Sequence, residues 1–192
     1  MIILPDVTLI ALTNKDFEGH KKALDISSEN IFFGGTKLIW DEEVTSIDIW
    51  NRKIIQDLYK YVDTTHALLI HADGYVINAN LWNPEWMTYD YIGAPWPLPT
   101  DDYSYRDEEG EIQRVGNSVS LRSKRLMERV AQFDWRAYYG NTNEDGFISV
   151  HHRKQLEKEG FKFAPLSVAV HFSKEHTIPE NKGLETFAFH SL

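Results

Sequence analysis

Short apolar runs alternate with longer amphipathic stretches through the first 71 residues. Residues 7–12 (Val-Thr-Leu-Ile-Ala-Leu) form a run that is typical of a strand buried on both faces, and residues 31–40 and 66–71 predict two further strands. Between these runs, a polar stretch that begins near Phe17 and a segment over 47–62 with apolar residues at steps of three and four predict helices. Because parallel strands need long connections, this order predicts a parallel sheet wound with helices.

The second helix and the carboxyl half have their own signals. Thr45-x-x-Asp48 is a capping-box pattern and predicts where the helix over 47–62 begins. After residue 74 the periodicity becomes shorter and less regular, which favours an α+β organisation. The elements predicted there are a strand over 115–121, helices over 123–133 and 144–159, and one or two strands over 161–172. The acidic stretch over 97–111 has too little apolar area to order itself, so we expect a mobile loop.

Composition narrows the class of protein. The chain has 192 residues, of which 42% are hydrophobic and 26% charged, which is typical of a single globular domain. A net charge of −9 argues against a general nucleic-acid binder, which needs a clustered basic surface. The absence of cysteine excludes disulfides, thiolate zinc sites and cysteine nucleophiles. No apolar run reaches about 18 residues, so we expect no transmembrane segment and a cytoplasmic location.

Two acidic motifs are candidates for chemistry. His71-Ala-Asp73-Gly74 follows a buried strand, where ligands of open α/β sheets gather and where a carboxylate can hold a divalent cation. An ordinary Asp-Gly turn explains the same letters. Glu144 and Asp145 are paired carboxylates at a predicted helix start and could serve as a general base or bind sugar hydroxyls. Thr142-x-x-Asp145 is also a capping box, so a purely structural role stays open.

The histidines give a weaker signal. His151 and His152 are adjacent on a predicted helix, where neighbouring side chains point about 100° apart, so the pair cannot chelate one metal ion. His190 stands alone near an apolar carboxyl end, and its role depends on what it meets in the fold.

A basic cluster and an aromatic group complete the candidates. Arg122 and Arg125 are three residues apart and could bind a phosphate or an anionic sugar, or form a solvated helix face. Tyr91 and Trp96 would suit stacking against a sugar ring, and would equally suit an ordinary core.

Several segments together, in their order along the chain, resemble a known family. The segments are Asp90-Tyr-Ile-Gly-Ala-Pro-Trp96, Val115-Gly-Asn-Ser-Val-Ser-Leu-Arg-Ser123, Glu144-Asp-Gly-Phe-Ile-Ser149, Gly160-Phe-Lys-Phe-Ala-Pro165 and Phe172-Ser173-x-Glu175. They are similar to the small, poorly characterised glycosyltransferase-like domains of GT-A type, over about residues 7–190. The Tyr-Ile-Gly-Ala-Pro-Trp element is the more specific part, whereas Glu-Asp and a lone His are not specific.

The resemblance implies a fold and an activity. The fold would be a GT-A-like α/β domain over residues 1–192, with a Rossmann-like nucleotide-binding half (1–74) and an acceptor and catalytic half (75–192). The activity would be transfer of a sugar from a nucleotide-diphosphate sugar, of UDP or dTDP type, to a glycan acceptor hydroxyl with inversion. A Mn²⁺ or Mg²⁺ ion would bridge the donor diphosphate. Polysaccharide biosynthesis is the implied setting.

The resemblance also implies roles for individual residues. Asp73, at the last position of an Asp-x-Asp motif, and His190 would hold the metal ion. Asp145 would be the catalytic base, with Glu144 as the alternative. Donor contacts are expected from Thr13, Asn14, His71 and Asp73, and acceptor contacts from Trp96, Tyr91 and Arg122.

Two departures from the family pattern leave other functions open. His71 stands where the first Asp of the motif is expected, and Ser118 and Val119 stand where related sequences tend to carry glycines. These departures suit a degenerate domain that binds a nucleotide or glycan, or scaffolds partners, without catalysis. A nucleotidyltransferase is a third possibility and ranks last, because no glycine follows the first strand until Gly19.

Overall fold

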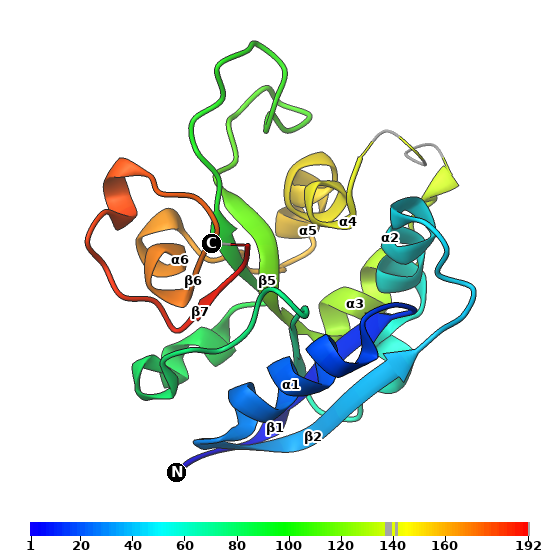
Figure 1. Cartoon of the computed structure of the whole chain (residues 1–192). Helices are drawn as coiled ribbons and strands as arrows, with labels where there is room; N and C mark the ends of the chain where they lie inside the picture. The colour runs from blue at the N-terminus through cyan, green and yellow to red at the C-terminus, as the bar shows by residue number, and fades with distance from the viewer. Residues whose placement is uncertain (137–139, 141, 192) are drawn as a thin grey trace.

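The centre of the molecule is a five-stranded sheet. The computed structural model describes residues 1–136, 140 and 142–191 (Figure 1). The sheet has the order β2-β1-β3-β5-β4, and the strands are β1 (Ile2–Thr13), β2 (Ile31–Trp40), β3 (His66–Leu69), β4 (Tyr91–Pro95) and β5 (Val115–Ser123). β1 pairs in parallel with β2 and β3, whereas β5 is antiparallel to both of its neighbours. This confirms the α/β class with a mostly parallel sheet, and one sheet takes strands from both predicted halves.

Helices lie on both sides of this sheet (Figure 1). They are α1 (Phe17–Ser28), α2 (Ile47–Gln56), α3 (Lys124–Val130), α4 (Glu144–Gly146), α5 (Arg153–Lys158) and α6 (Leu166–Phe172). A small parallel pair, β6 (Ser173–Lys174) and β7 (Ala188–Phe189), brings the carboxyl end of the chain beside the main sheet.

The alternation of side chains along β1 builds two cores. Leu9 and Ala11 face the side covered by α1, together with Leu24. Ile10 and Leu12 face the opposite side, in a second cluster with residues of α2 and α3. Both faces of β1 are therefore buried, as its uninterrupted apolar run predicts.

Four predicted elements differ from the structure. The predicted helix over 47–62 ends at Gln56 and is followed by a 3₁₀ helix, Leu58–Tyr61. The side chain that caps α2 is Ser46 rather than Thr45: its hydroxyl accepts the Ile49 amide at 3.2 Å. The predicted strands over 161–172 are wrong, because Leu166–Phe172 is a helix that begins after Pro165, a residue suited to a helix start. The predicted helix over 144–159 is broken into α4, a π-helical turn over Phe147–His151 and α5.

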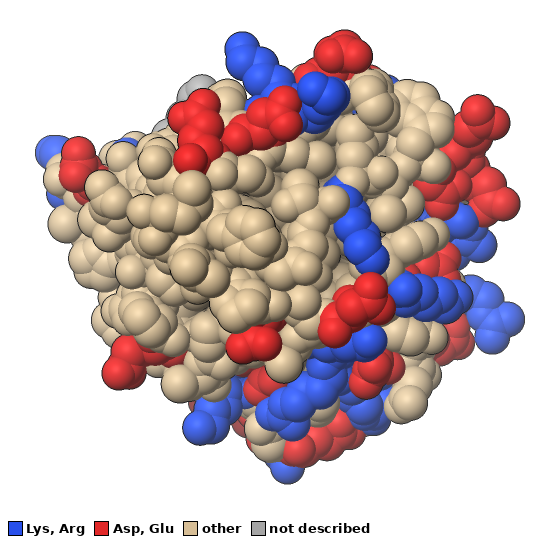
Figure 2. All heavy atoms as spheres, turned by 90° about the horizontal axis from the view of Figure 1, so that it is seen from below, with Lys and Arg blue, Asp and Glu red and all other residues tan. Residues whose placement is uncertain are grey.

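The surface mixes both signs of charge. On the face seen from below, Lys and Arg lie beside Asp and Glu, and an uncharged area covers much of the rest (Figure 2). In the described part of the chain, no helix combines the length and the apolar character that crossing a membrane requires.

Candidate functional site

The turn after β3 brings the carboxyl end of the chain to the edge of the sheet. The His71 amide donates to the Gly74 carbonyl at 2.8 Å, and the Gly74 amide donates back to the His71 carbonyl at 3.2 Å, which gives the tight turn that Asp73-Gly74 suggests. A Cβ on Gly74 would lie 2.7 Å from Cδ2 of His190. Glycine at this position therefore lets the two segments meet.

A line of three ionisable side chains crosses this edge. His190 Nε2 lies 3.4 Å from Asp73 Oδ1, and His190 Nδ1 lies 3.3 Å from Glu175 Oε1. The pairing of β6 with β7 sets this arrangement, since the His190 amide donates to the Lys174 carbonyl at 2.9 Å. The structure thus brings together Asp73 and His190, the two residues predicted to hold a metal ion.

Asp73 is held as a carboxylate. The Ser191 hydroxyl donates to its Oδ2 at 2.8 Å, and the Ser191 amide donates to its carbonyl at 2.9 Å. Burial on its own would raise the pKa of Asp73, but the Ser191 hydrogen bond and the nearby His190 together lower it below the ordinary value. Because its side chain is also 66% exposed, Asp73 is open to a ligand from solvent.

His71 is a neutral neighbour of this line. Its ring lies 4.8 Å from the ring of His190 and 5.6 Å from that of Trp50. Burial, followed by the nearby His190, lowers the pKa of His71 to about 3. The position that carries the first Asp in the family motif is therefore uncharged at neutral pH.

Asp73 and His190 fit a divalent metal ion in part. A carboxylate oxygen and an imidazole nitrogen that face one another at 3.4 Å are a donor set suited to Mn²⁺. Among the residues that the structure describes, no group of three His, Asp or Glu side chains is placed to hold an ion. The remaining ligands would have to be oxygens of a bound diphosphate and of water.

Glu144 lies below the surface and is paired with a buried arginine. Its Oε2 is 2.6 Å from Nη1 of Arg122, and the two side chains are 2% and 1% exposed. Burial opposes the charge on Arg122, but the adjacent Glu144 carboxylate raises the Arg122 pKa above its ordinary value. Ser120 and the ring of Tyr91 also contact the guanidinium group. Glu144 is thus neutralised by Arg122 and closed to substrate.

Asp145 has the opposite environment, although it follows directly in sequence. Its side chain is half-buried, and its Oδ1 accepts the Gly146 amide at 2.7 Å. Burial and then the charge of Glu144 raise the pKa of Asp145 to about 7. A carboxylate with such a pKa can take up a proton near neutral pH, which is the property of a general base.

The capping alternative for this motif is not supported. The residue before α4 is Asn143, whose side chain makes no cap hydrogen bond to the helix. Instead, Asn143 Oδ1 accepts from Asn51 Nδ2 at 3.1 Å, and Asn51 Oδ1 accepts the Glu144 amide at 3.1 Å. Asn51, fully buried on α2, therefore positions the start of α4.

All three predicted acceptor residues lie beneath the surface. Tyr91 is fully buried and its hydroxyl donates to the Gly116 carbonyl at 2.5 Å, while Arg122 is held by Glu144. Neither offers a surface to a sugar, so this part of the prediction is corrected: both residues support Glu144. Trp96 is also buried, and its ring stacks on that of Tyr105 at 4.9 Å and 15°.

The predicted donor residues at the end of β1 lie at the same sheet edge. The Thr13 hydroxyl donates to the Lys15 carbonyl at 2.8 Å and accepts the Lys15 amide at 3.1 Å, which forms a local turn. Asn14 is half-buried beside it. Their contact with a donor stays a prediction. Of the two positions where glycine is expected, Val119 is buried in the core, and the Ser118 side chain lies outside what is described.

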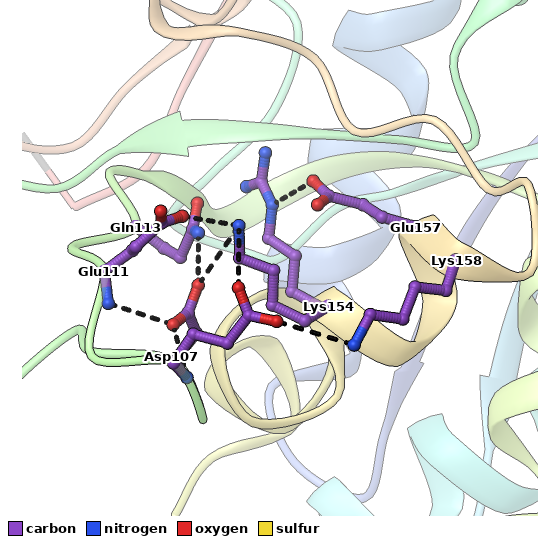
Figure 3. A network of polar contacts seen from close by, with 8 residues as sticks. Asp107, Glu111, Gln113, Lys154, Glu157 and Lys158 are labelled. Atoms are coloured by element: carbon purple, nitrogen blue, oxygen red, sulfur yellow. Dashed lines mark hydrogen bonds and ion pairs between the residues drawn. The ribbon is translucent and has the colours of Figure 1, made fainter.

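The segment over residues 97–114, here called the arm, extends from the sheet between β4 and β5 (Figure 1). Asp107 organises it by accepting the Glu109 and Glu111 amides and the Gln113 side chain. Lys154 of α5 forms ion pairs with Asp107, Glu109 and Glu111 (Figure 3). The expected loop is therefore tied to α5 by the acidic residues that suggested its mobility.

Sequence reasoning missed several residues that build the site. Glu175 appears in a motif of the resemblance, but without a role, and it is separated from its contact His190 by a whole loop. Trp50 belongs to the apolar pattern of a predicted helix and Asn51 is the polar residue that follows it, so neither carries a functional signal of its own. Tyr105 lies in the stretch expected to be mobile. Only three-dimensional proximity identifies these residues.

Comparison with solved structures supports the fold. The chain is similar to a glycosyltransferase involved in the glycosylation of the major capsid of PBCV-1, with a TM-score of 0.55, 11% sequence identity, and coverage of 96% of this chain and 92% of the other. A protein from STIV gives a TM-score of 0.43 at 12% identity, over 73% of this chain and 74% of that one. The first similarity shows a glycosyltransferase-like, GT-A-like fold and no more.

Sequence comparison places the chain in a family. No curated protein matches it significantly. One family model, however, covers residues 38–190, which is most of the chain and includes the turn after β3, Glu144, Asp145 and His190. The chain therefore belongs to the family described as "Protein of unknown function (DUF5672)".

Proposed function

We propose that the protein is an inverting glycosyltransferase that moves a sugar from a nucleotide-diphosphate sugar to a hydroxyl of a glycan acceptor. The observation that carries this proposal is the difference in environment between Glu144 and Asp145, which are adjacent in sequence. Glu144 is neutralised by Arg122, whereas Asp145 has a pKa of about 7 at the same sheet edge as Asp73 and His190. In this proposal a base and a pair of residues that would hold a metal ion lie on one side of a glycosyltransferase-like fold.

Asp145 is the base in this proposal. The acceptor hydroxyl gives its proton to the Asp145 carboxylate while its oxygen forms a bond to C1 of the donor sugar. The bond between C1 and the diphosphate oxygen breaks, and its electron pair leaves with the diphosphate. Attack from the side opposite the leaving group inverts the configuration at C1, by analogy with the carboxylate logic of inverting glycosidases. Burial and the charge of Glu144 raise the pKa of Asp145 and so its basicity, while the Gly146 amide and the charge of Arg122 oppose this in part.

The leaving diphosphate belongs at the other end of the site. Asp73 and His190 are the residues that would hold Mn²⁺ or Mg²⁺, which when bound offsets the charge that develops on a departing diphosphate. His71, uncharged at neutral pH, adds no repulsion toward that anion. Thr13 and Asn14 are the proposed contacts for the nucleoside. Tyr105, which is half-buried and stacks on the buried ring of Trp96, is the proposed acceptor side.

Two measurements on the same preparations test the proposal. Thermal unfolding with UDP and dTDP, each with and without Mn²⁺, should show a metal-dependent rise in Tm for one nucleotide, because a ligand at a hundredfold excess over its Kd adds about 2.7 kcal/mol. Asp73→Asn should lose this rise. Donor consumption by the wild type should increase with pH up to about 7, as Asp145 loses its proton, and Asp145→Asn should lower it by about 10²-fold or more.

The outcome separates an enzyme from a binding domain. Nucleotide binding without turnover, unchanged in Asp145→Asn, would contradict catalysis and favour a degenerate nucleotide-binding domain. Equal donor consumption by wild type and Asp145→Asn would contradict the base. Asn is a close isostere of Asp and is expected to leave the fold intact.

A further inference from the structure

Asn51 is a fully buried amide side chain on α2 that takes no part in the proposed reaction steps. Its Nδ2 donates to Oδ1 of Asn143 at 3.1 Å, and its Oδ1 accepts the Glu144 amide at 3.1 Å. A buried amide group is costly unless its polar ends are hydrogen-bonded. Both ends of Asn51 reach the same short segment, which comes directly before Asp145 in the chain.

The orientation of the Asn51 amide group follows from its partners. A backbone N–H can only donate, so the Asn51 atom that faces the Glu144 amide is the carbonyl oxygen. The NH₂ group then faces the Asn143 side chain. A leucine at this position would have a similar size but could make neither bond.

The helix α4 depends on Asn51 for its first amide. The first N–H groups of a helix have no partner within the helix, and the Asn143 side chain makes no cap hydrogen bond. Asn51 supplies the missing acceptor from another helix, in a buried setting. Without Asn51 the Glu144 amide would have to move toward water to regain a partner.

Asp145 depends on where this segment lies. Glu144 is anchored through its side chain to Arg122 and through its backbone to Asn51. Asp145 is the next residue, and its pKa of about 7 comes first from burial and then from the charge of Glu144. The charges of Arg122 and Glu175 act on it as well. The pKa of Asp145 is therefore sensitive to the position of α4.

The residue before Asn51 on α2 contacts the other end of the proposed site. Trp50 Nε1 donates to the Leu12 carbonyl at 2.8 Å, and the Trp50 ring lies 5.6 Å from the ring of His71. One turn of α2 therefore meets both the turn after β3 and the start of α4. Because side chains on a helix are held precisely, α2 sets the spacing of these two segments.

We propose that Asn51 is a positioning residue that holds the backbone at the start of α4 and thereby sets Asp145 at a fixed distance from the turn after β3. This inference rests on the proposed function, in which Asp145 is the base. Asn51 is buried and acts through the Glu144 amide, so it touches neither donor nor acceptor. A displacement of about 1 Å in a reacting group can lower a rate by about 10²-fold, so this hold matters for turnover.

The titration of Asp145 is the direct test, and it needs neither substrate nor metal ion. Carbon NMR of the side-chain carboxyl groups should show a midpoint of about 7 for Asp145 in the wild type, and Asp145→Asn assigns the signal by its loss. Asn51→Leu should lower the midpoint by about one pH unit or more, because a displaced α4 lets water reach the carboxyl group. Asn51→Ser, a smaller change that cannot reach both partners, should lower it less, and it keeps the test available if Asn51→Leu does not fold.

The matched control is Ile54→Ala, which removes core contacts from the same helix and leaves Asn51 in place. It should lower the Tm and leave the midpoint of Asp145 unchanged. Donor consumption is the second readout: kcat of Asn51→Ser should fall about 10-fold or more, with little change in KM for the donor, because the base and not the donor end is displaced.

The outcomes separate the inference from the proposed function. A midpoint that stays the same in both Asn51 variants, or that falls equally in Ile54→Ala, would overturn the inference. A midpoint near 3.8 in the wild type would overturn it as well, since Asp145 would not occupy a buried position. A midpoint lowered in the Asn51 variants alone, together with no donor consumption by the wild type, would support the positioning role and contradict the proposed function.

Discussion

Two networks of charged residues in this molecule differ in how far they are exposed to solvent. Near the proposed base, one pair, Arg122 with Glu144, lies almost entirely out of solvent. On the arm, Lys154 meets several carboxylates, of which Glu109 and Glu111 are about half exposed (Figure 3). The arm has more ion pairs, and those of Lys154 with Glu109 and Glu111 reach solvent, while the buried Asp107 lies 3.9 Å from Lys154 and also accepts hydrogen bonds from Gln113 and two backbone amides. The buried pair of Arg122 and Glu144 cannot be broken without leaving a charge in a medium of low polarity. Burial, and not the number of ion pairs, therefore determines how much a network matters for the free energy of unfolding.

Breaking the buried pair should have the largest effect. Arg122→Met keeps much of the side-chain volume but leaves Glu144 charged and unpaired, so we expect the free energy of unfolding to fall by about 3–5 kcal/mol. Urea denaturation followed by fluorescence measures this. The double variant Arg122→Met with Glu144→Gln removes the stranded charge and should recover part of the loss. If Arg122→Met were as stable as the wild type, the buried pair would not be the more important of the two networks.

A pair of intermediate burial should give an intermediate effect. Asp90 is buried and accepts hydrogen bonds from Ser123, Lys162 and Arg125, the last of which is 56% exposed. Asp90→Asn should lower stability by about 2 kcal/mol at neutral pH, mostly through the hydrogen bonds of the buried carboxylate. Asp90 lies at the end of the sheet opposite the proposed site, so the substitution should not change the binding of nucleotide.

The pH dependence of this loss has a definite sign. Burial by itself would raise the pKa of Asp90, but the hydrogen bonds from Arg125 and Ser123 lower it below 3.8. A lowered pKa in the folded state gives stability that is present above the unfolded value and disappears as the pH falls through the folded one. Wild type and Asp90→Asn should therefore converge in stability in strong acid. A difference that persists there would point to packing instead.

The stability contribution of Asp145 should change with pH in the opposite direction. Its folded pKa of about 7 lies above the unfolded value of 3.8, so the folded protein holds an extra proton in this window, and stability falls as the pH rises from about 4 to 7. Asp145→Asn removes this slope. Denaturation at several pH values between these limits should show the variant gaining on the wild type toward neutral pH. Parallel curves would contradict the raised pKa.

The sequence predicts the sheet and helices of the amino-terminal half because their signals are local. The run over 7–12 is buried on both faces, and the periodicity over 47–62 reflects the buried face of α2 and of the 3₁₀ helix Leu58–Tyr61 that follows it. The prediction fails over 161–172, where apolar residues that suit a strand are folded into a helix by packing against β4. Tertiary contacts override local preference there.

Residues of the candidate site also differ in whether the sequence could identify them. Asp73 and Asp145 stand in short acidic motifs, whereas His190 is a lone histidine whose role comes from the family resemblance; the roles of all three stay predictions. The pairing of Glu144 with Arg122 could not be predicted, since the two residues are far apart in sequence and only β5 and α4 bring them together. The same is true of Glu175, whose contact with His190 depends on a two-residue strand pair that has no sequence signature.

The smallest effect is expected where the ion pairs are most numerous. Lys154→Ala removes the contacts to Asp107, Glu109 and Glu111 at once, yet the free energy of unfolding should change no more than for an ordinary surface substitution. Asp107 keeps its bonds to Gln113 and to two backbone amides, so the turn of the arm stays formed. Hydrogen exchange of the arm amides should nevertheless become faster, because the link to α5 is lost. Salt should remove the difference between variant and wild type, since the Debye length falls to about 3 Å at 1 M. A large, salt-independent loss of stability would mean that the arm network is energetically equivalent to the buried pair, and would end the distinction between the two regions.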